Sequence, residues 1–158
     1  MHSRSGFTLV ELLITITIIS ILSAIGLVSY TNFVKNSRDV KRQSDLKFIQ
    51  SALEQYQADQ KYYPLPGSGN CPSPGDGMLR INCPLTDTLG NKTYLAQIPA
   101  ESQSSQPPYS YEARLANCDN NANKCTSYCL FVKLEGIPPS FDSRCPPSSL
   151  YNFSVSKP

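Results

Sequence analysis

Six cysteines in the C-terminal part of the chain have the clearest chemistry in the sequence. All of them lie between Cys71 and Cys145 of the 158 residues. An even number of cysteines in a loop-rich segment is typical of a domain held by disulfides. A zinc site is the competing interpretation, but the chain has no C-x-x-C pair, and its single histidine, His2, lies far from the cysteines. We therefore expect three disulfides and an oxidising compartment.

The connectivity of these cysteines is open at the level of sequence, because six cysteines can pair in many ways. We expect local pairing, since Cys118 and Cys125 flank a polar turn and would face each other across it. The expected pairs are Cys71–Cys83, Cys118–Cys125 and Cys129–Cys145. Each disulfide would contribute about 2–4 kcal/mol to the stability of a head with a limited core.

Glu11 is the only ionisable residue in an apolar run from Phe7 to Val28. A carboxylate at membrane depth is costly, so it usually marks a function. In a low-dielectric environment it would attract a cation far more strongly than it does in water. The competing interpretation is a protonated Glu11 that faces a neighbouring helix of an ordinary membrane protein.

The other polar residues do not favour an enzyme, a cofactor site or a metal site. The single histidine and the absence of a phosphate-binding glycine loop leave few means of catalysis. Asp119, Asn121 and Asn123 have the spacing that opens a calcium loop, but Lys124 occupies the position of the required glycine. A polar turn stabilised by Asp and Asn side chains is the better interpretation.

A basic stretch follows the apolar run, although the net charge of the chain is only +2. Its cations are Lys35, Arg38, Lys41, Arg42 and Lys47. Beside a membrane exit they are expected to contact lipid headgroups or the acidic residues of a neighbouring subunit. DNA is a third option that the sequence does not support.

The position of the prolines and the apolar spacing predict one long N-terminal helix. All 13 prolines follow Gln60, and Pro64 would stop the helix after about Lys61. Residues 7–28 span about 33 Å as a helix, which is enough to cross a membrane. Residues 29–61 form an amphipathic half with charged residues on its other faces. Its predicted apolar stripe comprises Tyr30, Phe33, Val34, Val40, Leu46, Ile49, Leu53 and Tyr56.

Alternating apolar residues after the helix predict a small antiparallel sheet. We expect a hairpin formed by residues 109–115 and 128–134 around a turn at 119–124. A third strand is expected near 150–155, and a short strand or turn at 93–98. The predicted class is α+β, with the amphipathic half-helix packed on this sheet in a loop-rich head. The expected segments are 1–6, a short polar stretch; 7–28, an apolar helix long enough to cross a membrane; 29–61, its amphipathic half; and 62–158, the head.

The run Gly6-Phe7-Thr8-Leu9-Val10-Glu11 resembles the cleavage and methylation signal of type IV prepilins and type II secretion pseudopilins. Weaker similarity to the major pseudopilins covers residues 45–66 and 94–112, and loosely 128–135. The resemblance implies that residues 1–6 are a leader, and that a prepilin peptidase cuts between Gly6 and Phe7 and N-methylates Phe7. It further implies that residues 7–28 form a transmembrane or filament-core helix. It also implies that Glu11 of one subunit faces the Phe7 amine of another.

The expected function is that of a non-enzymatic structural subunit of a type IV pilus or a type II secretion pseudopilus. The alternative is a minor pilin whose head binds DNA, as in competence, or a surface. The implied partners are the prepilin peptidase/N-methyltransferase, other pilin subunits, an inner-membrane assembly platform and membrane lipid.

Two signals disagree about the side of the membrane on which the head lies. The cations after the apolar run would place it in the cytoplasm by the positive-inside rule. The cysteines and the resemblance place it outside, and we give them greater weight. We expect a single-pass precursor in the inner or plasma membrane, with the head in the periplasm or at the cell surface and then in an extracellular filament.

Overall fold

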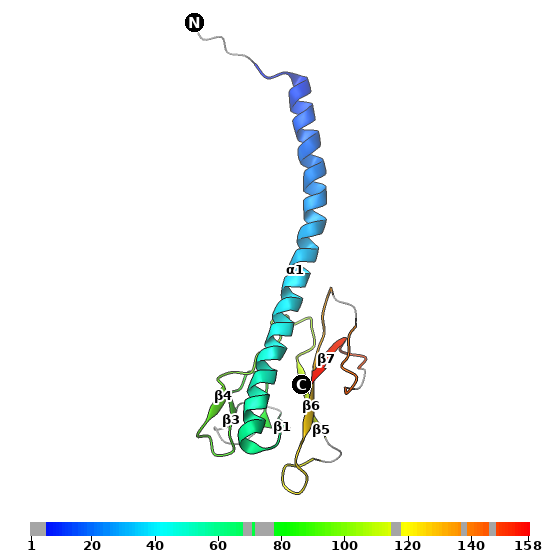
Figure 1. The fold of residues 1–158 in the computed structure, drawn as a ribbon. Helices are drawn as coiled ribbons and strands as arrows, with labels where there is room; N and C mark the ends of the chain where they lie inside the picture. Colours follow the sequence, from blue (N-terminus) through cyan, green and yellow to red (C-terminus); the bar gives the residue numbers. More distant parts are fainter. Residues whose placement is uncertain (1–5, 68–70, 72–77, 115–117, 137–138, 146–147) are drawn as a thin grey trace.

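The protein consists of one long helix whose second half carries a head of short strands (Figure 1). The computed structural model describes residues 6–67, 71, 78–114, 118–136, 139–145 and 148–158. Helix α1 runs from Leu9 to Gln60 without a break, and its first half projects beyond the head. The predicted α+β class with a long N-terminal helix is thus confirmed. The expected leader lies outside the described residues, apart from Gly6.

Both ends of α1 have clear local causes. Thr8 is the N-cap, and its side chain accepts a hydrogen bond from the backbone N–H of Glu11. At the other end, Lys61 adopts a left-handed conformation with φ of 69°, and its N–H donates to the Gln57 carbonyl at 2.8 Å. Pro64 then prevents further helix. The 52 residues of α1 correspond to about 78 Å.

Two short strand pairs flank the lower end of α1. β1 (Leu65–Pro66) pairs with β2 (Met78–Leu79) in parallel, and β3 (Leu85–Thr86) pairs with β4 (Thr93–Leu95) in an antiparallel hairpin. The parallel pair was not predicted, because strands of two residues are too short to show an alternating pattern.

The main sheet has three antiparallel strands in the order β5–β6–β7. β5 (Ser110–Arg114) pairs with β6 (Ser127–Val132), and β6 pairs with β7 (Phe153–Ser156). The hairpin and the third strand predicted from the alternating residues are confirmed. β6 is more deeply buried than a half-buried strand, because its second face is covered as well: Phe131 packs with Tyr151 and Cys145.

The main core lies between this sheet and the second half of α1. The helix contributes Leu46, Ile49, Ala52, Leu53 and Tyr56 to a cluster that includes Tyr111, Tyr128, Leu130 and Val132 of the sheet. The start of the predicted stripe is wrong, because Tyr30, Phe33 and Val40 are 66%, 70% and 63% exposed. Asp39 and Arg42 are buried in place of Val40.

Candidate functional site

The first turn of α1 holds the lone carboxylate of the apolar run. Glu11 accepts hydrogen bonds from the backbone N–H of Thr8 at 2.9 Å and from its hydroxyl at 2.8 Å. Thr8 in turn accepts from the Glu11 N–H, so the two residues form a reciprocal capping box. Phe7 directly precedes this box and is 81% exposed. Glu11 thus has a structural role at the helix start that its isolation in the sequence did not reveal.

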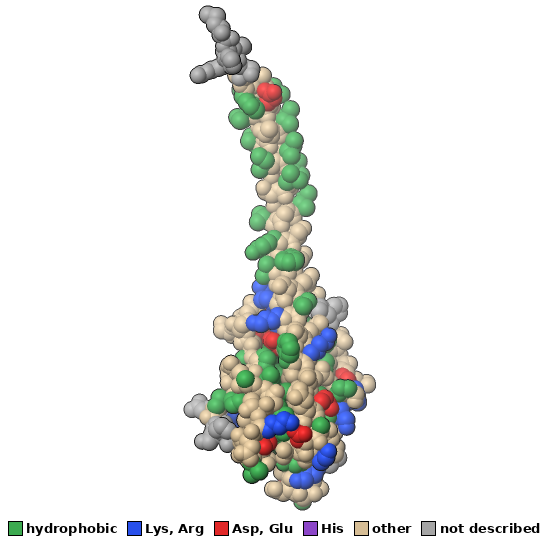
Figure 2. All heavy atoms as spheres, turned by 60° about the vertical axis from the view of Figure 1, so that its left-hand side comes forward, with side chains coloured by type: hydrophobic (Ala, Val, Ile, Leu, Met, Phe, Trp, Pro, Cys, Tyr) green, Lys and Arg blue, Asp and Glu red, His purple; other side chains and the backbone are tan. Residues whose placement is uncertain are grey.

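The apolar half of α1 projects away from the described part of the head. It contains an 18-residue window with a mean hydropathy of 2.4, none of it buried, so α1 is long and apolar enough to cross a membrane. The hydroxyls of Thr15, Thr17 and Ser20 donate to carbonyls of the preceding turn at 2.7–2.8 Å, as expected for polar residues in an apolar helix. Figure 2 shows apolar side chains along this part of the rod and cations beginning where it meets the head.

A cluster of charged side chains lies where α1 enters the head. This neck cluster comprises Arg38, Asp39, Arg42, Glu101, Gln103 and Glu135. The Arg42 side chain is only 2% exposed. Its guanidinium donates to Glu101 at 2.6 Å, to Glu135 at 2.7 Å and to Asp39 at 2.9 Å. Burial alone would lower the pKa of Arg42, but these hydrogen bonds raise it above its ordinary value, so the guanidinium stays charged.

Asp39 joins the helix directly to the backbone of the head. Its carboxylate accepts from the N–H of Glu135 at 2.9 Å and from the N–H of Gly136 at 2.7 Å. Arg38 binds both oxygens of Glu135, at 2.9 and 2.5 Å. These hydrogen bonds from Arg38, with those from Arg42, lower the pKa of Glu135 to about 2. Glu135 is therefore ionised at any pH near neutrality.

The neck cluster corrects the expectation for the basic stretch. Arg38 and Arg42 bind carboxylates of their own head instead of lipid or a neighbouring subunit. Lys35, Lys41 and Lys47 remain exposed. The sequence did not predict this cluster, because the partner carboxylates lie some 60 to 97 residues along the chain.

Further hydrogen bonds join the second half of α1 to tyrosines of the head. Asp45 accepts a hydrogen bond from the Tyr109 hydroxyl at 2.9 Å. Glu54 accepts from the hydroxyls of Tyr63 at 3.0 Å and Tyr128 at 3.1 Å. The tyrosines thus bury their rings in the core and satisfy carboxylates on the helix, which gives them a structural role.

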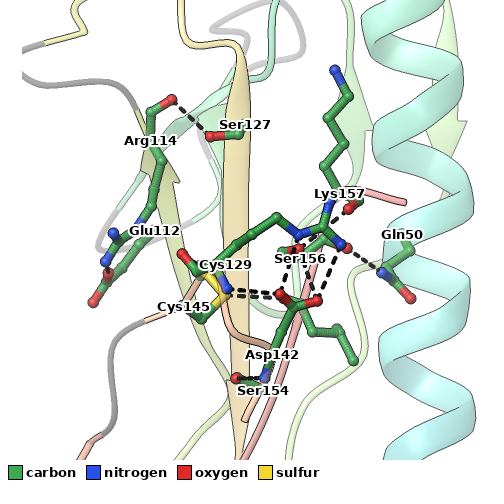
Figure 3. The surroundings of a disulfide bond; sticks show 12 residues. Gln50, Glu112, Arg114, Ser127, Cys129, Asp142, Cys145, Ser154, Ser156 and Lys157 are labelled. Carbon is green, nitrogen blue, oxygen red and sulfur yellow. Dashed lines mark hydrogen bonds and ion pairs between the residues drawn. A yellow bond between two sulfur atoms is a disulfide. The ribbon is translucent and has the colours of Figure 1, made fainter.

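Three disulfides hold the head, and they join Cys71 to Cys83, Cys118 to Cys125 and Cys129 to Cys145. The last one fixes the C-terminal segment to the central strand β6 (Figure 3). Beside it, Asp142 accepts from the Arg144 side chain and backbone N–H and from the Ser156 hydroxyl. The hydrogen bonds from Arg144, with that from Ser156, lower the pKa of Asp142 to about 2.

The segment around Asp119 is a turn, as predicted. One Asp119 oxygen accepts from the backbone N–H groups of Asn121 and Asn123 at 2.9 and 3.0 Å. Asn120 has φ of 59°, a conformation that Asn tolerates better than most residues. Within the described ranges, no three His, Cys, Asp or Glu side chains gather so as to hold a metal ion.

The described structure combines an exposed apolar half-helix with a disulfide-bonded α+β head. Such a protein can be anchored in an apolar environment through its N-terminal helix. The prokaryotic N-terminal methylation motif matches residues 1–27. A type IV major alpha-pilin of Moraxella bovis is 37% identical over 54 residues, which are 34% of this chain and 34% of that protein. The chain thus covers about a third of the length of this relative. No solved structure is significantly similar to the chain.

Part of the chain is therefore similar to a type IV pilin, and its N-terminal residues match an N-terminal methylation motif, as the resemblance in the sequence predicted. The pilin family is structural and non-enzymatic. The apolar helix fits both a membrane-anchored precursor and a filament.

Proposed function

We propose that the protein is a structural subunit of a type IV pilus or a type II secretion pseudopilus, assembled through its N-terminal helix. The observation that carries the proposal is the unburied apolar half of α1, most of which lies within the match to the N-terminal methylation motif. The large apolar side chains from Leu9 to Leu27 on this half are 50–73% exposed. Such a surface is not stable in water and requires lipid or other apolar helices around it.

In this proposal the precursor spans the inner or plasma membrane once, and its head lies outside the cytoplasm. A prepilin peptidase removes residues 1–6 by cutting between Gly6 and Phe7, and the same enzyme N-methylates Phe7. An inner-membrane assembly platform then brings the apolar halves of α1 from successive subunits together, and the heads cover the outside of the filament.

Glu11 provides the pairing charge for assembly. It lies in the turn that follows Phe7, so the amine released by cleavage and the carboxylate are presented at the same end of the helix. When helices pack, Glu11 of one subunit pairs with the Phe7 amine of another, where the low dielectric strengthens their attraction.

Two substitutions separate this pairing from helix capping. Glu11→Leu removes the charge and the capping acceptor, whereas Glu11→Gln removes only the charge, because Gln also completes a capping box. Both precursors should insert and lose residues 1–6, and wild-type intact mass should show one added methyl group. Sheared filament yield, checked by electron microscopy, should fall strongly for both variants. Normal yield from Glu11→Gln would show that capping, not charge pairing, is the role of Glu11.

Uncleaved wild-type chain in cells with an active prepilin peptidase would overturn the proposal as a whole. Deletion of the gene, followed by parallel assays of motility, protein secretion and DNA uptake, distinguishes a pilus subunit from a pseudopilus subunit. Loss of secretion alone would assign the pseudopilus, and loss of motility would assign the pilus.

A further inference from the structure

The hairpin between β3 and β4 ends in Asn91-Lys92-Thr93, a match to the acceptor sequence for N-linked glycans, N-x-[ST] with x other than Pro. We propose that Asn91 is glycosylated, with an oligosaccharide attached to its side-chain amide nitrogen. All three residues of the acceptor sequence are exposed.

The backbone of the acceptor sequence is held in place by Asp87. One Asp87 oxygen accepts from the N–H of Asn91 at 2.7 Å and from the N–H of Lys92 at 3.3 Å. Gly90, with φ of 72°, closes the turn before Asn91 in a conformation that glycine adopts without strain. The turn is thus ordered by backbone contacts, and the Asn91 side chain makes no hydrogen bond to any other residue in the described part of the chain.

The surroundings of Asn91 have room for a bulky, polar group. The hairpin lies on the flank of α1 away from the β5–β6–β7 sheet (Figure 1). Leu89, two residues before Asn91, is 77% exposed, more than any other large apolar side chain in the described part of the head. Glycans are bulky and solubilising, so one at Asn91 would shield this leucine from water without disturbing the core.

A second match to the acceptor sequence provides an internal control. Asn152-Phe153-Ser154 has the same pattern, but the Asn152 side chain is occupied. Its oxygen accepts from the Leu134 N–H at 2.6 Å, and its nitrogen donates to the Leu134 carbonyl at 2.9 Å. Attachment of a sugar to that nitrogen would break a contact that joins the residue before β7 to the segment that follows β6. The structure therefore assigns the glycan to Asn91 and not to Asn152.

The transfer requires a sugar donor of the lipid-pyrophosphate-linked oligosaccharide class and an oligosaccharyltransferase. The bond from the anomeric carbon to the pyrophosphate oxygen breaks, and a bond from that carbon to Nδ2 of Asn91 forms. The lipid pyrophosphate leaves with the electron pair, and one amide proton passes to a base of the transferase. The proposal rests on the proposed function in one respect, since such transfer takes place outside the cytoplasm.

The test is mass spectrometry of the full-length mature protein from the cells that make it, with electron-transfer fragmentation to locate any added sugar. Thr93→Val removes the acceptor hydroxyl and keeps the β-branched shape suited to β4, whereas Thr93→Ser keeps the hydroxyl. Wild type and Thr93→Ser should carry a glycan on Asn91, while Thr93→Val and Asn91→Gln should lose it completely. Asn152 should be unmodified in every sample.

The same spectra, recorded without reduction, report the state of the cysteines. Bare Asn91 in wild type with three intact disulfides would overturn the glycosylation proposal alone. Bare Asn91 with reduced cysteines would overturn both proposals, because the head would then not have left a reducing compartment. A sugar that persists in Thr93→Val, or that maps to Asn152 or to a hydroxyl, would also refute the assignment to Asn91.

Discussion

Replacing Arg42 by alanine tests whether the neck cluster holds the head to the helix. The substitution leaves the carboxylates of Asp39 and Glu101 without the guanidinium that neutralises them, and both are almost completely buried, at 0% and 5% exposure. Removing one partner of a buried ion pair typically costs about 3–5 kcal/mol, because the other charge is left without compensation. Asp39 keeps its backbone donors at Glu135 and Gly136, which favours the lower end of this range.

The expected loss is large compared with the total stability of a small domain, which is about 5–15 kcal/mol. For a domain of this size 1 kcal/mol corresponds to about 4 °C or more in melting temperature, so Arg42→Ala should lower it by about 12 °C or more. Circular dichroism of the mature chain in detergent measures this, with the near-ultraviolet tyrosine signal reporting on the head.

Lys47→Ala is the matched control, because Lys47 is an exposed cation on the same helix. It should change the melting temperature by no more than about 2 °C, as exposed charges contribute at most about 0.5 kcal/mol. Arg42→Lys keeps the charge but loses the forked geometry and should fall between the two. If Arg42→Ala melts like Lys47→Ala, the guanidinium is not needed and the reasoning about the neck cluster is wrong.

The other predictions concern pH, a disulfide and a buried phenol. Folding lowers the pKa of Glu135 from 4.5 to about 2. The ionised carboxylate therefore contributes its full stabilisation of the folded state above pH 4.5, and this contribution should be lost as the pH falls toward 2. Melting temperatures recorded across this acid range would show the loss. The double replacement of Cys129 and Cys145 by alanine opens a loop of 16 residues and should cost about 3 kcal/mol, measured by the same melts; an unchanged melting temperature would argue against a stabilising role. Tyr109→Phe leaves the buried Asp45 carboxylate without its phenol donor and should cost about 1–3 kcal/mol, whereas a neutral result would mean that water replaces the phenol.

Much of the fold was predictable because its signals are local. The absence of proline before Pro64 and the apolar run from Phe7 predicted a single long helix, and α1 ends at Gln60, within one residue of the expected boundary. Alternation marked the strands of the main sheet, and the clustered Asp and Asn residues after Cys118 marked the turn. The N-terminal motif identified the end of the helix that the proposed function uses.

The features that sequence did not predict depend on contacts between distant segments. Periodicity indicated that Val40 would face the core, whereas Asp39 and Arg42 are buried there. A charged residue can occupy a core position only where opposite charges meet it, and those charges come from Glu101 and Glu135. Nothing in the spacing of the helix residues shows that the chain brings these carboxylates back to this point.

The position of the neck cluster has a mechanical consequence for a protein held by one end of a long rod. A pull along α1 from its free half reaches the head close to the ion pairs of Arg38 and Arg42 and the backbone contacts of Asp39. From there the tension passes to Glu135, which lies three residues beyond the end of β6. β6 is the central strand and is hydrogen-bonded to a neighbouring strand on each side. The force is therefore applied to the strand whose separation from the sheet would break the most hydrogen bonds. An attachment to β5 would instead load a strand that, within the described part of its sheet, pairs with β6 alone.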